Sequence, residues 1–179
     1  MSAGLLERER TALVVVDVQE AFRKAVGGFE EVARRTAVLV RGARELGVPI
    51  IVTEQYPRGL GDTVAEVREP LGDAPRLPKT AFSAVRAEGF DLGGRDQALV
   101  CGVEAHVCVA QTVIDLLAAG VAVQVAGDAT ASRNVADRDT GLHRMEQAGA
   151  VLTGTEAALF ELLGAAGTPE FKAVQELIK

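Results

Sequence analysis

Two side chains in this sequence, Asp17 and Cys108, are suited to proton transfer and nucleophilic attack. Asp17 directly follows the apolar run 12–16, and partial desolvation at such a strand end tunes a carboxylate as a general base. The alternative is an aspartate that fixes a turn or caps a helix. Cys108 follows the apolar run 98–101 at the predicted start of a helix, where free N–H groups and the helix dipole lower the pKa of a thiol. Its alternative, a small buried hydrophobe, is the interpretation that we favour for Cys101.

The remaining candidates are Lys79 and the two histidines. Lys79 follows Pro78 and precedes apolar residues, so it is either an inward-facing partner of an anion or a solvated surface charge. His106 is two residues from Cys108 and does not face it on a helix, whereas a loop at this point would let it reach a pocket. His143 belongs to a largely polar helix and is predicted to be exposed. A Cys/His dyad is therefore not expected.

Neither a metal site nor a cofactor site is predicted. Two isolated histidines without an H-x-x-x-H or a paired C-x-x-C motif do not make a zinc site. The sequence contains no G-x-G-x-x-G motif, no Walker A loop and no G-x-S-x-G elbow, so nucleotide binding and serine hydrolysis lack their motifs. Asp128, which follows a further apolar run, is expected to fix its own turn.

Five short apolar runs predict the strands that position these residues. They lack the alternation of a one-sided sheet, which is typical of strands buried on both faces of a parallel sheet. The runs are residues 12–16, 49–52, 98–101, 121–126 and 150–152. Helical patterns over residues 32–46, 105–119 and 137–148 are each followed by a glycine. The chain therefore repeats a βαβ unit, and ligands bind such folds beyond the carboxyl ends of the strands, where the strand order reverses.

The middle of the chain, residues 54–96, is less regular and contains most of the prolines, so we expect its loops to shape a pocket. Residues 79–82 form a candidate further strand within it. Near the end of the chain, Thr168 and Pro169 predict the N-cap and the first turn of a last helix.

The composition indicates one globular domain over residues 1–179. The chain is 48% hydrophobic and 25% charged, and its net charge of -6 disfavours nucleic acids and anionic membranes as partners. No apolar run approaches the roughly 18 residues of a membrane span. The first ten residues carry mixed charges in place of an apolar signal segment. We therefore expect a cytoplasmic protein with reduced cysteines and a small-molecule substrate.

Three motifs in this chain resemble the isochorismatase-like cysteine hydrolase superfamily. They are Asp17-x-Gln19 after the first predicted strand, Lys79 in the middle segment, and the block from Cys101-Gly102-Val103 to Cys108-Val109-x-x-Thr112. The similarity extends from residue 12 to about residue 160. Three longer segments resemble, more narrowly, the isochorismatase domain-containing subfamily: Val-Thr-Glu-Gln-Tyr-Pro at residues 52–57, Lys79-Thr80-x-Phe82-Ser83, and Gly102-Val103-Glu104-Ala105-His106-Val107-Cys108.

The resemblance implies a catalytic triad of Asp17, Lys79 and Cys108. It also implies a Rossmann-like, three-layer α/β/α fold with a six-stranded parallel sheet of order 3-2-1-4-5-6. A cis peptide bond between Val103 and Glu104 is implied as well, which would direct the backbone N–H groups of Glu104 and Cys108 at an oxyanion. The residues that we expect in the wall of the substrate pocket are Gln19, Phe22, Tyr56 and Phe82.

The implied activity is hydrolysis of a small amide, carbamoyl or related carbonyl compound through a thioester. Two departures of this sequence from other members of the superfamily narrow the expected activity. Residues 53–56 are Thr-Glu-Gln-Tyr, where metal-dependent nicotinamidases of the superfamily have Asp-x-His, and isochorismate hydrolases lack a cysteine at the position of Cys108. The alternatives are a catalytically silent scaffold of the same fold and a vinyl-ether hydrolase. We also expect a homo-oligomer, a dimer or tetramer, with an interface at helix 105–119, whose only polar side chains are His106, Gln111, Thr112 and Asp115.

Overall fold

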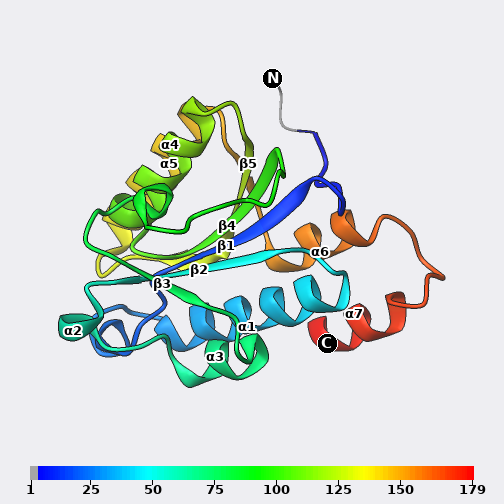
Figure 1. The fold of residues 1–179 in the computed structure, drawn as a ribbon, viewed down its shortest axis with the longest axis horizontal. Coiled ribbons are helices and arrows are strands. Elements are labelled where there is room, and N and C mark those ends of the chain that lie inside the picture. Colours follow the sequence, from blue (N-terminus) through cyan, green and yellow to red (C-terminus); the bar gives the residue numbers. More distant parts are fainter. Residues whose placement is uncertain (1–3) are drawn as a thin grey trace.

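The computed structural model describes residues 4–179 as a parallel sheet between two layers of helices (Figure 1). The strands follow the order β3-β2-β1-β4-β5-β6, and every neighbouring pair is parallel. They are β1 (Thr11–Val16), β2 (Ile50–Gln55), β3 (Arg76–Lys79), β4 (Gln97–Val103), β5 (Ala122–Ala131) and β6 (Val151–Thr153). The predicted three-layer α/β/α fold of order 3-2-1-4-5-6 is confirmed.

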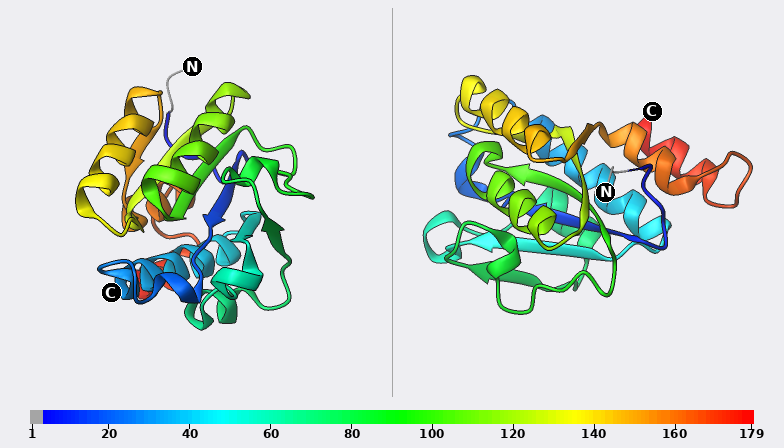
Figure 2. Two further views of the ribbon diagram at one scale, coloured as in Figure 1. Left: turned by 90° about the vertical axis from the view of Figure 1, so that its left-hand side faces the viewer. Right: turned by 90° about the horizontal axis from the view of Figure 1, so that it is seen from above.

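The helices divide between the two faces of the sheet, as the views in Figures 1 and 2 agree. One face is covered by α1 (Phe29–Glu45), α3 (Ala65–Leu71), α6 (Thr155–Leu163) and α7 (Phe171–Ile178), and the other by α4 (Ala110–Ala118) and α5 (Val135–Gln147). The short helix α2 (Pro57–Leu60) follows β2, and 3-10 turns lie at Glu20–Phe22 and Ala84–Arg86. Each face of the sheet therefore has its own hydrophobic core.

Burial explains why the central strands read as continuous apolar runs. All six residues of β1 and all seven of β4 are buried, because helices cover both of their faces. Helix α1 buries the predicted stripe, which comprises Val32, Thr36, Leu39, Ala43 and Leu46. Gly47 follows it with φ of +67°, the left-handed conformation that ends helices at low cost only for glycine. The apolar patterns predicted β1, β4 and α1 correctly because their apolar residues are the ones that the fold buries.

The predicted third strand and last helix differ from the structure. The third strand is Arg76–Lys79 and not residues 79–82, because it lies at the edge of the sheet, is partly exposed, and is defined by pairing with β2 instead of by an apolar run. The last helix begins at Phe171, and Thr168 does not cap it with its side chain. Its backbone oxygen accepts a hydrogen bond from Phe171 N–H within a preceding turn.

The order of the strands reverses between β1 and β4, so the crossovers from these strands leave toward opposite faces. The carboxyl ends of β1, β2, β3 and β4 therefore meet on the side of the molecule where α2 lies (Figure 1). No helix within residues 4–179 is both long and apolar enough to cross a membrane.

Candidate active site

A buried ion pair joins the ends of β1 and β3. Lys79 Nζ lies 2.7 Å from Asp17 Oδ2, and Thr53 at the end of β2 donates from its hydroxyl to Asp17 Oδ1 at 2.7 Å. The backbone of Asp17 turns out of the strand with φ of +54°, a conformation that a non-glycine residue keeps only where its surroundings hold it. Strand pairing provides this restraint, because Asp17 N–H donates to Thr53 O at 3.2 Å.

Lys79 is enclosed by oxygen acceptors. Besides Asp17, its ammonium group donates to Gln55 Oε1 at 2.6 Å and to the carbonyl oxygens of Phe82 at 2.8 Å and Ala81 at 3.3 Å. The Gln55 amide is oriented in turn, because its Nε2 donates to Thr80 O at 2.9 Å. Lys79 is therefore inward-facing, with a side chain that is only 1% exposed.

Cys108 lies in a π-helical turn, Ala105–Val109, and not in the first turn of a regular α-helix as the sequence suggested. The wider turn is defined by Val109 N–H donating to Glu104 O at 3.2 Å, five residues back. Thr112 holds the backbone of Cys108, because its hydroxyl donates to Cys108 O at 2.7 Å. The peptide bond before this turn, Val103–Glu104, is cis.

The protonation of Cys108 differs from the sequence prediction. Burial, and then the negative charge of Asp17, raise the pKa of the Cys108 thiol to about 12, against the opposing effect of Lys79. Burial also raises the pKa of Asp17 above its ordinary value, although Lys79 and Thr53 oppose it. The expected low-pKa thiolate at a helix start is therefore wrong, since desolvation and a neighbouring carboxylate outweigh the helix dipole. At neutral pH Cys108 is therefore a thiol.

A cavity of about 470 Å³ opens onto Cys108. Its wall is mostly apolar and comprises Ala21, Phe22, Ala25, Gln55, Leu60, Phe82, Glu104, Val107, Cys108 and Arg133. Phe22 and Phe82 lie in this wall, as the sequence suggested, and Phe82 is 52% exposed at its mouth. A cavity of this size accommodates a small molecule.

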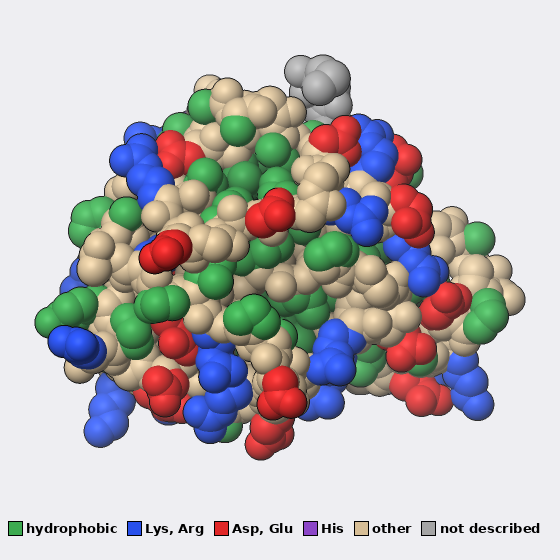
Figure 3. Space-filling model, in the orientation of Figure 1, with side chains coloured by type: hydrophobic (Ala, Val, Ile, Leu, Met, Phe, Trp, Pro, Cys, Tyr) green, Lys and Arg blue, Asp and Glu red, His purple; other side chains and the backbone are tan. Residues whose placement is uncertain are grey.

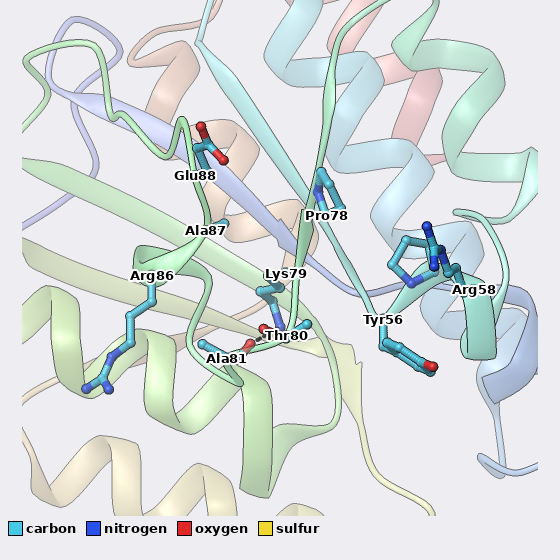
Figure 4. A pocket seen from close by; sticks show the side chains of 10 residues that line it. Tyr56, Arg58, Pro78, Lys79, Thr80, Ala81, Arg86, Ala87 and Glu88 are labelled. Atoms are coloured by element: carbon cyan, nitrogen blue, oxygen red, sulfur yellow. Dashed lines mark hydrogen bonds between the residues drawn. The ribbon is translucent and has the colours of Figure 1, made fainter.

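Gln19 and Tyr56, the other two expected wall residues, lie elsewhere. Gln19 is fully buried and joins β1 to β2: its Nε2 donates to Gln55 O, and its Oε1 accepts from Gln55 N–H. Tyr56 turns outward with φ of +37° and lines a second cavity, of about 520 Å³, along the edge strand β3. Figure 4 shows Tyr56 and Arg58 on one side of this second cavity and Arg86 and Glu88 on the other.

The sequence reading missed Gln55 and Arg133. Gln55 lies in the segment where metal-dependent nicotinamidases have Asp-x-His, and the hydrogen bond that it accepts from Lys79 depends on the tertiary fold. Arg133 follows β5 and contacts Glu104. Arg133 could have been predicted from its position, because it is a charged residue just after the carboxyl end of a strand.

The histidines and the second cysteine do not join the group around Asp17. His106 Nδ1 lies 3.0 Å from Ser132 Oγ, and His143 has a side chain that is 70% exposed. Cys101 is fully buried within β4, where burial raises its thiol pKa to about 12. Asp128 does not fix its own turn, because it accepts hydrogen bonds from Thr155 N–H and Oγ1 at the start of α6. Among residues 4–179, no cluster of three or more His, Cys, Asp or Glu side chains is arranged to hold a metal ion.

The fold and the site define a Rossmann-like α/β/α protein with an acid, a lysine and a cysteine gathered at the switch point of its sheet. The chain belongs to the isochorismatase-like hydrolase family, since the isochorismatase domain model matches residues 11–157. It is 42% identical to isochorismatase domain-containing protein 1 of Salmo salar over 98% of this chain. The chain spans 63% of the length of that relative.

Solved structures show the same similarity. The structure described as MAR1 ribonuclease from Caenorhabditis elegans matches with a TM-score of 0.92 and 41% identity, over 98% of this chain and 92% of that one. YcaC from Pseudomonas aeruginosa, solved with hexane-2,5-diol and covalent acrylamide, matches with a TM-score of 0.87 and 26% identity over 99% and 93%. YcaC from Escherichia coli, described as an octameric hydrolase of unknown specificity, has a TM-score of 0.81 and 26% identity over 90% and 83%.

Proposed function

We propose that this protein hydrolyses a C–N bond in a small amide, carbamoyl or related carbonyl compound, with Cys108 as the nucleophile. The observation that carries the proposal is the convergence of Cys108 with the buried Asp17–Lys79 pair at the floor of an apolar cavity. A weakly acidic thiol next to a carboxylate needs a base at the moment of attack, and Asp17 is the group in position to act as one. The covalent acrylamide in the YcaC structure fits a nucleophilic side chain in that relative, because acrylamide is an electrophile to which thiols add at the alkene carbon, leaving the amide intact.

In the first half of the reaction, Asp17 takes the proton from Cys108 while the sulfur forms a bond to the substrate carbonyl carbon. The charge that develops on the carbonyl oxygen is stabilised by the backbone N–H groups of Glu104 and Cys108. Lys79 holds the Asp17 carboxylate in place through its contact at 2.7 Å. The C–N bond then breaks, Asp17 returns the proton to the departing nitrogen, and an amine or ammonia leaves a thioester on Cys108.

In the second half, Asp17 takes a proton from a water molecule, whose oxygen attacks the thioester carbonyl. The C–S bond breaks, the proton returns to the sulfur, and a carboxylic or carbamic acid leaves. The apolar wall formed by Phe22, Leu60 and Val107 limits the water around the thioester. The Cys108 proton thus leaves on the departing nitrogen and a proton from water replaces it on the sulfur, so the cycle closes without an external cofactor.

The proposal is tested by ammonia release from a panel of small primary amides and carbamoyl compounds. We expect Cys108→Ser to abolish turnover, whereas Cys101→Ser, which changes a thiol outside the cavity, retains it. Acid-quenched samples of the wild type should contain a thioester at Cys108 by peptide mass spectrometry. Equal, measurable turnover by wild type and Cys108→Ser would overturn the assignment of the nucleophile, and no turnover by the wild type on any compound of the panel would favour the scaffold function. Conversion of isochorismate by both proteins would instead identify a vinyl-ether hydrolase.

Ribonuclease activity is the second candidate, because the Caenorhabditis elegans relative at 41% identity carries that description. Two observations weigh against it here. The net charge is -6, and acidic and basic side chains are interspersed over the face in Figure 3 with no continuous basic patch on it. Incubation with end-labelled single-stranded RNA decides the question: we expect no cleavage above a buffer control, and cleavage lost in Cys108→Ser would establish the nuclease.

Assembly and location complete the proposal. We propose a homo-oligomer with an interface that includes residues 105–119, and the octameric relative from Escherichia coli supports oligomerisation. Light scattering at micromolar concentration should give a mass at least twice the 18.7 kDa of the chain. Both cysteines are free, which fits a reducing compartment such as the cytoplasm, and fractionation of cells that express the protein would test this.

A further inference from the structure

Arg133 is held at the rim of the Cys108 cavity by two residues of the segment that carries the nucleophile. Its backbone N–H donates to Glu104 Oε1 at 2.9 Å, and its side-chain Nε donates to the same oxygen at 3.0 Å. The preceding residue, Ser132, is buried and lies 3.0 Å from His106 Nδ1. The loop between β5 and α5 is thus attached at two residues, Glu104 and His106, of the segment that leads into Cys108, which orients the Arg133 side chain in advance.

The outer end of the guanidinium group is available to a ligand. Glu104 engages only Nε, and within the part of the chain that the structure describes neither Nη1 nor Nη2 has a hydrogen-bond partner. The Arg133 side chain is 60% exposed, whereas that of Glu104 is 8% exposed. A molecule in the cavity therefore meets the cation, while the carboxylate beneath it is covered.

Arg133 is also the one accessible charge in the cavity wall. Most of the other wall residues are Ala, Phe, Leu and Val. Apart from Cys108, the wall contains one other ionisable side chain, that of Glu104, which is almost fully covered. Lys79 and Asp17 are not part of this wall and form a pair with at most 1% exposure. An anionic group on a ligand thus has a single favourable position.

We propose that Arg133 binds a carboxylate of the substrate, so that the natural substrate is a small amide or carbamoyl compound that carries an anionic group. A guanidinium edge and a carboxylate match in planar geometry, and two parallel N–H donors fix both position and orientation. Phe22 and Phe82 would contact the apolar body between the two polar ends. This inference rests on the proposed function, since it takes Cys108 as the group that attacks the carbonyl.

The test compares neutral and anionic alkylating agents at Cys108. Iodoacetamide and iodoacetate differ in the charge next to the reacting carbon, and N-ethylmaleimide and 3-maleimidopropionate form a second pair with a longer reach. For each pair, the rate ratio of anionic to neutral reagent at Cys108 is measured by peptide mass spectrometry and divided by the same ratio for N-acetylcysteine. The proteins compared are wild type, Arg133→Gln, Arg133→Lys and Arg144→Gln, the last being an exposed arginine on α5 with the same change in net charge.

We expect at least one anionic reagent to be favoured at Cys108 of the wild type, and Arg133→Gln to reduce that preference by about five- to tenfold. Arg144→Gln should leave it unchanged, and Arg133→Lys should keep part of it. A wild-type ratio no higher than that of N-acetylcysteine for both pairs, or an equal ratio in wild type and Arg133→Gln, would overturn the inference. If Arg133→Gln does not fold, the wild-type ratio and Arg133→Lys still decide it. Failure of Cys108 to react faster than Cys101 with any reagent would count against the nucleophile, and thus against the proposed function itself.

Discussion

Asp17 and Lys79 form an ion pair 2.7 Å long in which neither side chain is more than 1% exposed. Two charges removed from water in this way stabilise a fold little as a pair, but either one alone is costly. The pair joins β1 to β3 across β2, since the three strands are neighbours in the sheet. It therefore places a carboxylate beside Cys108 without adding net charge to the interior.

Removal of the lysine should destabilise the protein. Lys79→Met leaves the Asp17 carboxylate buried without its cation, and we expect the free energy of unfolding to fall by about 3 kcal/mol at neutral pH. Burial already raises the pKa of Asp17, and the loss of Lys79 raises it further. A group with a raised pKa stabilises the folded state at low pH and loses that effect as pH rises, so the deficit should shrink on mild acidification.

Urea unfolding at neutral and mildly acidic pH measures this effect. Lys24→Met, at an exposed lysine, serves as the control and should change little at either pH. A deficit for Lys79→Met that is small, or that does not depend on pH, would contradict the buried-pair interpretation.

Substitution of Asp17 should make the Cys108 thiol easier to ionise but slow the hydrolysis of substrate. The negative charge of Asp17 raises the pKa of Cys108, so Asp17→Asn should lower it below about 12 and make the alkaline rise in iodoacetamide labelling begin at lower pH. Hydrolysis should nevertheless fall by about 10²- to 10⁴-fold, because the proton acceptor is lost.

Labelling of Cys108 across a pH series, with Cys101 in the same protein as the internal reference, checks the first half of this prediction. Turnover of the best amide in the panel checks the second. A labelling curve that moves to higher pH in Asp17→Asn would show that the carboxylate does not act on the thiol as described.

Cys101 should make the protein sensitive to alkali. Burial raises its pKa from 9.0 to about 12, so the unfolded chain loses this proton first and stability falls as pH rises between those values. Cys101→Ala lacks this titration, and over the lower half of the interval it should lose about 2 kcal/mol less than the wild type. Denaturant unfolding at matched pH values measures the two slopes; parallel slopes would refute the prediction.

Gly102 should tolerate no side chain. It pairs with Val16 across β1 and β4, has φ of +125°, and an added Cβ would overlap the carbonyl oxygen of Val16. We expect Gly102→Ala to lower the free energy of unfolding by about 3 kcal/mol or more, because both strain and overlap act on buried backbone.

Gly27 provides the matched control for this substitution. A Cβ at Gly27 has open space within 4 Å, so Gly27→Ala should leave the thermal unfolding midpoint nearly unchanged. Similar midpoints for the two alanine variants would show that β1 and β4 can separate at their carboxyl ends more easily than the contacts suggest.

The sequence was informative where a residue and its neighbours along the chain determine the local structure. The buried runs at β1 and β4 and the periodic pattern of α1 predicted those elements, and Asp17 was found because it directly follows β1. Resemblance to a known superfamily supplied the strand order and the link to Lys79, which composition and spacing alone left as a surface charge.

The parts that the sequence did not predict depend on contacts between distant segments. Gln55 and Arg133 acquire their positions only when β2 meets β3 and when β5 ends beside Glu104. The raised pKa of Cys108 follows from burial and from Asp17, two effects that a local reading of a helix start does not contain. The position of β3 was missed because an edge strand needs no apolar run.

The edge strand β3 has a consequence for how molecules of this protein meet one another in concentrated solution. An exposed strand at the edge of a sheet is a template on which a second chain can add a strand and begin an aggregate. Pro78 lies within this strand, next to Lys79, and it has no backbone N–H to donate to an added strand. Pro78, which directly precedes the lysine of the site, thus also protects the sheet against growth at this edge.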